Sequence, residues 1–485
     1  GARSAATQPG LGGTDAATEP GLNGTEAGTG RTAGPQTTRA DASDLAHGLF
    51  GGEKQADPNQ HAHQAVAHFM NYCGHRDEAF VAAKYAPPLG GKARLVRSIV
   101  ITRHGDRSVK STEECHRLMD KRTQAKSLDQ CGVEAHQVDE AGGRLDVDTD
   151  HGTTATDAEM GGSPGVPAWQ LKKQVPTRTT DLDEGAQLTE WGYKQHQVLG
   201  QALRDRFKEM GICRGGADPA ACVKVFATDT NRTIQSAIAL LSTFAPESDI
   251  PVHVNASLTQ TFGTAADYQA GWLEFNRRQS ADSNRQSDRF ALRRKLGGGS
   301  VHLMADCVAT AWCWNKLWMF KEEVAGQEVL EGLYEVWMDR LRFLGAADAG
   351  SPAEYLTRGL RDRILDDFQQ FAAGSPDAYP IKVFSAHDDT IAPVLAFFGA
   401  YKGPVKEWQF PALASHVAFD LYVNQLGENR VVMSAYGERV HLCGPSTGDG
   451  SCALWEFRRA CSPHAATSIF GSSAGSIGEG FEPQK

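Results

Sequence analysis

The sequence lacks three features that would place it in well-defined classes. No apolar run approaches the length of a membrane-spanning helix. Paired CxxC motifs and Cys/His clusters with zinc spacing are also absent, so the cysteines predict no zinc site. An excess of positive charge is missing too: 49 Lys and Arg against 59 Asp and Glu give a net charge of −10. This balance argues against a general nucleic-acid-binding protein, and we expect no nucleic-acid partner.

Ten cysteines are nevertheless present, and four of them form close pairs around loops. Cys443 and Cys452 bracket the loop GPSTGDGS, and Cys213 and Cys222 bracket RGGADPAA. Such spacing is typical of disulfides, which form in oxidising compartments. We therefore expect a protein of the secretory pathway: Golgi lumen, secreted or lysosomal. The alternative is a cytosolic enzyme with buried free thiols.

Glycosylation sequons agree with that compartment. Asn23 and Asn255 each begin an Asn-X-Ser/Thr sequence and predict a glycoprotein. A third sequon, at Asn231, falls within the predicted ligand site, so we do not expect a glycan there. Because the chain begins with Gly1 rather than Met, a signal peptide or an N-terminal membrane anchor removed before Gly1 would be compatible with this reading.

Composition changes along the chain predict its organisation. Residues 1–45 are Gly, Thr, Ala and polar residues with almost nothing apolar, which predicts a disordered stalk or a plain flexible linker. The tail at 463–485 has a similar composition. Between them we expect one domain at 46–462, with a polar surface insertion at about 111–180 and a helical cap at about 263–375.

Strand and helix patterns alternate within that domain, which indicates an α/β fold. We predict a mostly parallel central sheet flanked by helices, with the helical cap inserted before the last parallel strand. Residues 418–423 and 431–435 are expected to be edge strands. The remaining segments are strands expected at 95–101, 223–227, 251–255 and 381–386 and a helix at 188–207.

A dense cluster of charge follows the first of these strands. Arg103, His104, Gly105, Asp106 and Arg107 come directly after the apolar run that ends in IVIT. In an open α/β sheet, ligands bind beyond the carboxyl ends of the strands. A guanidinium matches phosphate oxygens bidentately, and a neutral imidazole nitrogen can attack phosphorus. The cluster therefore predicts a phosphate site, the alternative being two solvated loop arginines around a turn histidine.

Two later strands end in side chains that would complete such a site. The strand at 223–227 leads through Asp229-Thr230-Asn231 to Arg232 at the start of a helix, and the strand at 381–386 leads to His387 and Asp388. His387 can donate to a phosphoryl oxygen, and Asp388 can protonate a leaving group. Arg232 facing water is the alternative, although a cation in the first turn of a helix opposes the helix dipole.

These stretches resemble the motifs of the histidine acid phosphatases. RHGDR at 103–107, TNRTIQSA at 230–237 and SAHD at 385–388 occur in the family's order. QLTEWGYKQHQVLGQALRDRF at 187–207 is similar to the family's LTxxGxxQxxxxGxxLR helix, and CGPSTGDGSCALWEF at 443–457 is similar to its closing disulfide loop. The sequence departs from the family at Val109, where a proline is usual.

Within the family, the chain resembles the 2-phosphoxylose phosphatases. These Golgi enzymes carry an N-terminal membrane helix and a stem, and they dephosphorylate xylose in the glycosaminoglycan linkage region. QLTEWGYKQH, NRTIQSAIALLSTFAP and SAHDDTIAPVL carry this part of the resemblance.

The resemblance implies a phosphomonoesterase with a phosphohistidine intermediate. In this reading His104 attacks phosphorus, and Asp388 protonates the leaving alcohol and then assists the attacking water. Arg103, Arg107, Arg232 and His387 hold the non-bridging oxygens. We expect neither a metal nor a cofactor, and the expected partner is a phosphorylated small molecule or glycan.

Three alternatives remain open from the sequence. One is an acid phosphatase of broad specificity. Another is a phosphotransferase or mutase, which would pass the phosphoryl group to a second alcohol. The last is a catalytically weak protein that binds phosphorylated or sulfated glycans through its arginines; such a protein would need neither His104 nor Asp388.

Overall fold

The computed structural model describes residues 72–73, 93–120, 166–167, 186–213, 219–254, 261–314, 316–344, 350–375, 379–401, 410–443 and 450–461. All of them belong to one compact unit, Asp57–Lys485. The predicted stalk and tail lie outside these ranges, as do the sequons at Asn23 and Asn255. No helix within the ranges is long and apolar enough to cross a membrane.

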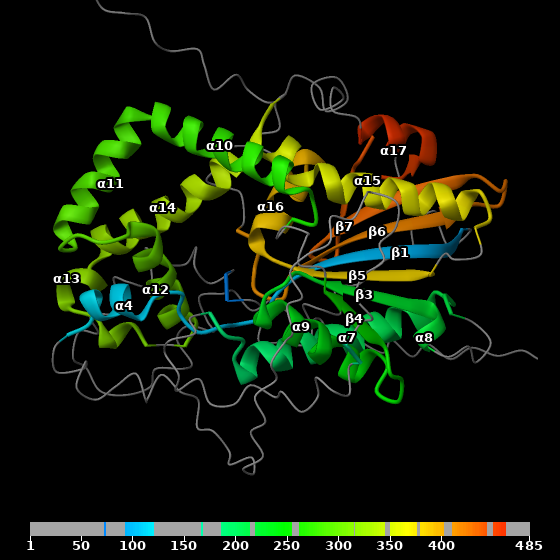
Figure 1. Cartoon of the computed structure of the whole chain (residues 1–485), viewed down its shortest axis with the longest axis horizontal. Helices are drawn as coiled ribbons and strands as arrows, with labels where there is room; N and C mark the ends of the chain where they lie inside the picture. Colours follow the sequence, from blue (N-terminus) through cyan, green and yellow to red (C-terminus); the bar gives the residue numbers. More distant parts are fainter. Residues whose placement is uncertain are drawn as a thin grey trace, which may run out of the picture. The chain divides into compact units, whose positions relative to one another are not determined.

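The described strands form one nine-stranded mixed sheet in the order β2-β4-β3-β5-β1-β6-β7-β8, with β9 paired to β7 (Figure 1). The four central strands, β4, β3, β5 and β1, are parallel to one another, and the other pairings are antiparallel. The strands are β1 (Arg94–Arg103), β2 (Val166–Pro167), β3 (Val223–Ala227), β4 (Pro251–Val254), β5 (Ile381–Ala386), β6 (His416–Val423), β7 (Asn429–Ala435), β8 (Glu438–Val440) and β9 (Cys452–Ala453).

The predicted α/β class is confirmed, but the sheet is parallel only at its centre. The two segments expected to be edge strands form the antiparallel hairpin β6–β7, and β6 also pairs with β1. Seven of the eight residues of β6 are buried. A strand buried on both faces cannot leave its backbone N–H and C=O groups unpaired at an edge, so β6 lies inside the sheet.

Helices cover both faces of the sheet (Figure 1). On one face, Val100 packs with residues of α7 (Glu190–Glu209) and α9 (Asn231–Phe244). On the other face, Ile99 and Ile101 pack with residues of α15 (Pro352–Ala372), α16 (Asp388–Phe397) and α17 (Leu454–Ala460). The alternation along β1 follows the two-residue period of a strand and produces a three-layer sandwich.

A block of helices is inserted between β4 and β5 and forms the predicted cap. It contains α10 (Ala265–Ala281), α11 (Ser283–Lys295), α12 (Val301–Cys313), η4 (Leu317–Met319), α13 (Glu322–Ala325) and α14 (Gln327–Leu344), and α15 leads back to the sheet. Helix α4 (Thr112–Leu118) packs into the same block, where Cys115 and Leu118 are buried. The expectation of a surface insertion from residue 111 is therefore wrong at its start, because these apolar side chains need a core.

Three disulfides join described residues: Cys73–Cys313, Cys115–Cys307 and Cys443–Cys452. The last was predicted and is confirmed. The predicted bond between Cys213 and Cys222 is wrong, because both are free thiols. Helix α8 (Pro219–Cys222) ends at the second of these. Burial and the neighbouring Cys222 raise the pKa of Cys213, which keeps the reactive thiolate scarce.

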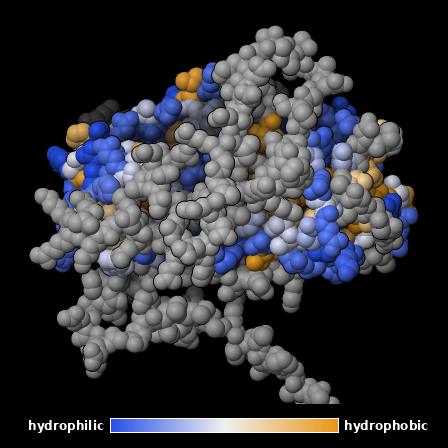
Figure 2. Space-filling view, turned by 60° about the horizontal axis from the view of Figure 1, so that its bottom comes forward, coloured by the Kyte–Doolittle hydropathy of each residue, from blue (hydrophilic) through white to orange (hydrophobic). Residues whose placement is uncertain are grey.

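The surface carries no broad hydrophobic area over the coloured part of Figure 2, which is mostly hydrophilic. The large hydrophobic side chains exposed among the described residues come from separate elements: Leu273, Phe290, Trp318, Leu426 and Trp455. Single exposed side chains of this kind are ordinary on soluble domains.

Candidate active site

Three neighbouring parallel strands bring the predicted site residues together. β5 lies between β3 and β1, and its end is in register with both: Ala386 pairs with Arg103, and Ser385 pairs with Ala227. The segments that follow these strands therefore meet at one edge. The rings of His104 and His387 are 5.6 Å apart between centroids. All six predicted residues lie in this neighbourhood.

The ring of His104 is held in one tautomer. Its Nδ1 lies 2.8 Å from the carbonyl oxygen of Gly105, which can only accept, so Nδ1 carries the proton and Nε2 keeps a lone pair. The side chain is buried, and burial together with Arg232 and Arg103 holds its pKa well below the usual range. His104 is therefore a neutral imidazole even in mild acid, as a nucleophile must be.

His387 is also held in one tautomer, by two protein partners. Arg232 donates from Nη2 to Nδ1 at 3.1 Å, so the ring proton is on Nε2, which lies 2.8 Å from Oγ1 of Thr228. Burial and Arg232 hold the pKa of His387 well below its usual range. In the free protein His387 therefore orients Arg232, and Arg232 itself has its pKa lowered to about 10, chiefly by burial.

Each site arginine has a donor without a partner. Arg103 donates to Oη of Tyr72 at 3.2 Å, and Arg107 donates to the carboxylate of Asp306. The buried Nε–H groups of Arg103, Arg107 and Arg232 have no hydrogen-bond partner among the described residues. An unpaired buried donor is costly, and a bound oxyanion would supply the missing acceptors.

Asp388 is an ionised carboxylate at the start of α16. Burial alone would raise its pKa, but Arg103, Arg340 and Lys110 outweigh burial and lower the pKa well below the usual range. Its Oδ2 lies 3.6 Å from Nη2 of Arg103. The N-terminus of the helix favours the charge as well. In the ligand-free protein Asp388 therefore has no proton to donate.

Sequence reasoning did not identify four further charged residues around the site. Lys110 and Asp306 lie beside Arg107, and Arg340 of α14 pairs with Asp389. Burial lowers the pKa of Lys110 to about 8 and raises that of Asp389. Only Asp306 had a sequence signal, as the one acidic residue of the apolar stretch VHLMADCVATAWC. Nothing in the sequence distinguishes Arg340 from the other charges of its helix.

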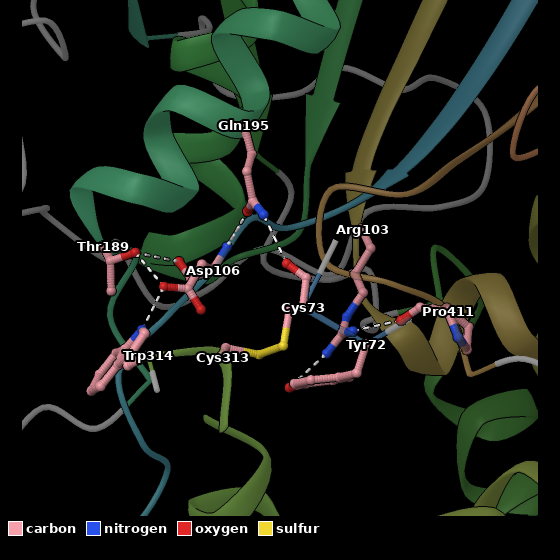
Figure 3. The surroundings of a disulfide bond; sticks show 9 residues. All are labelled: Tyr72, Cys73, Arg103, Asp106, Thr189, Gln195, Cys313, Trp314 and Pro411. Atoms are coloured by element: carbon pink, nitrogen blue, oxygen red, sulfur yellow. Dashed lines mark hydrogen bonds between the residues drawn. A yellow bond between two sulfur atoms is a disulfide. The ribbon is translucent and has the colours of Figure 1, made fainter. Parts of the chain in front are cut away.

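Helix α7 packs directly on the loop that carries His104. A Cβ at Gly105 would lie 2.7 Å from Cα of Gly192, and one at Gly192 would lie 2.6 Å from the backbone nitrogen of Asp106. Thr189 caps the helix by accepting from the N–H of Gly192 and donates to the carboxylate of Asp106 at 2.7 Å (Figure 3). Two glycines are needed here because the backbones touch.

Part of the chain is similar to a known protein family. Residues 94–331 match the model of the Histidine phosphatase superfamily (branch 2). The predicted family is thereby confirmed at the level of the superfamily, and the predicted phosphatase class is confirmed with it. No curated protein matches the chain.

Solved structures to which the chain is similar include two phytases and a multiple inositol polyphosphate phosphatase. A Hafnia alvei phytase in complex with tartrate is 14% identical, covers 79% of this chain and 98% of its own, and has a TM-score of 0.46. The Citrobacter braakii phytase is 13% identical over 76% and 97% of the two chains, with a TM-score of 0.47. The Bifidobacterium longum multiple inositol polyphosphate phosphatase with inositol hexasulfate is 10% identical over 81% and 96%, with a TM-score of 0.49.

Two buried histidines behind the site predict a loss of stability in acid. His196 donates from Nε2 to the carbonyl oxygen of Arg103 at 3.0 Å, and burial lowers its pKa to about 4. Burial and Arg206 lower the pKa of His416 to about 3. An unfolded histidine titrates near about 6.5, so below that pH the unfolded chain binds protons that the folded chain does not. The free energy of unfolding should therefore fall from about pH 6.5 down to pH 4, by about 3 kcal/mol for His196 alone.

Urea unfolding at pH 7.5 and 4.5 measures this loss. A His196→Asn variant keeps a donor toward Arg103 but cannot titrate, so its loss between the two pH values should be smaller by about 2–3 kcal/mol. His441→Asn, at an exposed position, should lose as much as the unchanged protein. Equal losses in the His196→Asn and unchanged proteins would contradict the prediction.

Proposed function

We propose that this phosphatase works by transferring the phosphoryl group to Nε2 of His104 and then to water. The observation that carries the proposal is the tautomer of His104. Its Nδ1–H is held by the carbonyl oxygen of Gly105, which leaves Nε2 unprotonated in a pocket that also contains three arginines. A binding protein would need the arginines but not a nucleophile held in this state.

In this mechanism the three site arginines neutralise the negative charge of the phosphoryl oxygens. Arg103, Arg107 and Arg232 would donate to these oxygens from Nε–H groups that have no partner among the described residues. His387 would join them once Arg232 turns to the phosphate and leaves Nδ1 free. A proton on Nδ1 is then favoured by the negative charge of the ligand.

Asp388 would move one proton through the reaction. The substrate enters as a monoanion and passes its proton to the carboxylate of Asp388. Nε2 of His104 attacks phosphorus, the ester P–O bond breaks, and Asp388 returns the proton to the leaving oxygen. The carboxylate then takes a proton from a water molecule, whose oxygen attacks phosphorus and breaks the N–P bond. Asp388 gives that proton to the phosphate, which leaves as the monoanion, so both His104 and the Asp388 carboxylate are restored.

This proton balance predicts an acidic pH optimum. A phosphomonoester loses its second proton near about pH 6, so kcat/KM should fall as the pH rises above about 6. His104 does not limit activity on the acid side, because its pKa is held far below 6.5. Asp388→Asn should lower kcat/KM, which depends only on the steps up to release of the alcohol, by about 10²–10⁴-fold for alkyl phosphates and much less for p-nitrophenyl phosphate, whose leaving group needs no proton. Steady-state rates on both substrates from pH 4 to 8 measure this, and an equal loss on both would exclude Asp388 as the acid.

For the substrate, we propose the 2-phosphate of xylose in the glycosaminoglycan linkage region. Support comes from the sequence resemblance to the 2-phosphoxylose phosphatases, and the disulfides fit a lumenal or secreted protein in the Golgi or beyond it. An acid phosphatase of broad specificity is the second candidate. A panel containing a 2-phosphoxyloside, p-nitrophenyl phosphate and phosphoserine separates the two. At least a tenfold higher kcat/KM on the xyloside supports the first, and similar values on all three support the second.

The covalent step has its own test. The protein is mixed with ³²P-labelled substrate and quenched in alkali, in which phosphohistidine survives. Label should remain on the protein and disappear on acid treatment. A protein that hydrolyses the substrate without any trapped label over the whole time course would overturn the phosphohistidine mechanism. Adding a competing alcohol tests for a transferase, which would form a new ester instead of inorganic phosphate.

A further inference from the structure

One cap helix, α12, is linked to Arg103, Asp106 and Arg107 of the RHGDR cluster, directly or through a neighbouring residue. Asp306 binds Arg107, Trp314 at the C-terminal end of the helix binds Asp106, and the Cys73–Cys313 bond ties the helix to Tyr72, which binds Arg103. We propose that α12 positions Arg103 and Arg107 for phosphate, with Asp306 and Tyr72 as positioning residues and the Cys73–Cys313 disulfide as the link. This inference rests on the proposed function of the two arginines.

Asp306 fixes the segment that follows the cluster. Its carboxylate accepts from both terminal nitrogens of Arg107, and it also accepts from the backbone N–H of Lys110 at 3.1 Å. The Nζ of Lys110 lies 3.9 Å from it. Arg107 is almost fully buried, and its only other hydrogen bond in the described part of the chain is to the carbonyl oxygen of Ser108. The orientation of this guanidinium is therefore set by the cap.

Asp106 is a second residue of the cluster that contacts the end of α12. Nε1 of Trp314 donates to Oδ2 of Asp106 at 2.9 Å, and Thr189, the N-cap of α7, donates to the same oxygen (Figure 3). One carboxylate thus joins the end of α12 to the start of α7. Because the residue lies between His104 and Arg107 in the chain, a shift of the helix end would be passed to both neighbours.

Arg103 is reached through the disulfide. Cys73 is bonded to Cys313, and the preceding Tyr72 has its ring 4.7 Å from the Arg103 guanidinium and its Oη 3.2 Å from Nη2 (Figure 3). The carbonyl oxygen of Cys73 accepts from Gln195, which accepts from the backbone N–H of Asp106. Tyr72 and Cys73 therefore lie between α12, α7 and the cluster.

The helix itself is firmly held. Cys307, next to Asp306, is bonded to Cys115 of α4, and Glu114 of α4 accepts from the N–H of Ser300 at the N-cap of α12. Ten of its thirteen residues are buried. A rigid support of this kind is what fixes a catalytic side chain to within the tolerance that phosphoryl transfer needs.

Asp306 has two opposite effects on phosphate, and they predict opposite results. As a negative charge near the site it repels phosphate, so its removal would tighten binding. As the partner of Arg107 it holds the guanidinium in place, so its removal would loosen binding and slow the reaction. A protein that is merely less stable would lose active molecules, but the inhibition constant of the remaining ones would not change.

The decisive measurement is competitive inhibition by inorganic phosphate in Asp306→Ala and Asp306→Asn. We expect the inhibition constant to rise about 10-fold in the alanine variant, and kcat/KM to fall about 100-fold. Asparagine keeps one acceptor oxygen and should lie between. An inhibition constant that is unchanged or lower in both variants would overturn the positioning role. The asparagine variant carries the same test if the alanine variant does not fold.

Asp339→Asn is the matched control. Asp339 is also a buried cap carboxylate, paired with Arg285, Arg289 and Arg342, but it has no contact with the RHGDR cluster in the described part of the chain. It should leave the inhibition constant for phosphate unchanged.

Calorimetric measurement of phosphate binding, in the absence of substrate, distinguishes the proposed positioning role from the proposed mechanism. If phosphate binds but no label is trapped on His104, the proposed mechanism is wrong. The effect of Asp306 on phosphate binding is measured independently of that outcome.

The disulfide is tested by a matched pair of double variants. Cys73→Ser/Cys313→Ser should raise the inhibition constant of phosphate at least 3-fold, because Tyr72 is released from Arg103. Cys443→Ser/Cys452→Ser also removes one cross-link, but Cys452 belongs to β9, which pairs with β7, and the variant should leave the constant unchanged. The same constant in both variants, or a change only in the control, would overturn the role of the Cys73–Cys313 bond.

Discussion

Replacing His104 with alanine is expected to lower kcat for phosphomonoesters by about 10⁴-fold or more, since removal of a covalent nucleophile leaves only binding and charge stabilisation. KM should change little, because the three site arginines remain. The reason lies in the geometry: Nε2 of His104 is the one unprotonated imidazole nitrogen of the site whose lone pair is not already used by Arg232.

The measurement combines kcat with covalent trapping. His104→Ala should retain no ³²P after an alkaline quench, and its circular dichroism should match that of the unchanged protein. His387→Asn is the control: it removes the neighbouring ring but keeps the nucleophile, so label should still be trapped, at a lower rate. Label retained by His104→Ala would move the nucleophile to another residue and would end the assignment.

The site residues that the sequence predicted all follow a parallel strand. His104, Arg232 and His387 each come within a few residues of the end of β1, β3 or β5, and those ends must meet once the strands pair. Local patterns therefore determine this half of the site. Tyr72 and Asp306 come from a loop and a cap helix whose docking depends on tertiary packing, and no local pattern gives the direction in which a helix is packed.

The cysteines show the same limit. Spacing predicted the Cys443–Cys452 bond, which spans 9 residues, because a short polar loop brings its ends together. The bonds Cys73–Cys313 and Cys115–Cys307 span 240 and 192 residues, and only the fold makes those pairs neighbours. Many connectivities are compatible with one set of cysteines, so spacing can find the local pairs and nothing more. The wrong prediction for Cys213 and Cys222 shows that even local spacing is not sufficient.

The mixed sheet has a similar cause. Apolar runs at 418–423 and 431–435 predicted two edge strands. Which side of β1 the hairpin would occupy was not encoded locally. The full burial of β6 decides it in the structure, because both faces of the strand need a covering layer.

Replacing Gly192 with alanine should destabilise the protein by about 3 kcal/mol or more, against the direction of helix propensity. Alanine is better than glycine inside a helix by about 1 kcal/mol, and Gly192 lies in the first turn of α7. The added Cβ would, however, lie 2.6 Å from the backbone nitrogen of Asp106. Backbone atoms cannot rotate away, so either α7 or the RHGDR loop must move. A displacement of about 1 Å at Arg107 would lower kcat/KM by about 100-fold.

Gly326→Ala provides the comparison, because it differs only in what the new methyl group meets. Gly326 has a φ of −66°, which alanine adopts freely, and its nearest neighbour would be 3.5 Å away. Its free energy of unfolding in urea should stay within about 1 kcal/mol of the unchanged protein. If Gly192→Ala were as stable and as active as Gly326→Ala, the backbone contact between α7 and the loop would not exist as described. If Gly192→Ala loses both stability and activity, that contact explains why α7, which is far from His104 in sequence, has to carry glycine at this position. The backbone of α7 packs directly against the loop that carries His104.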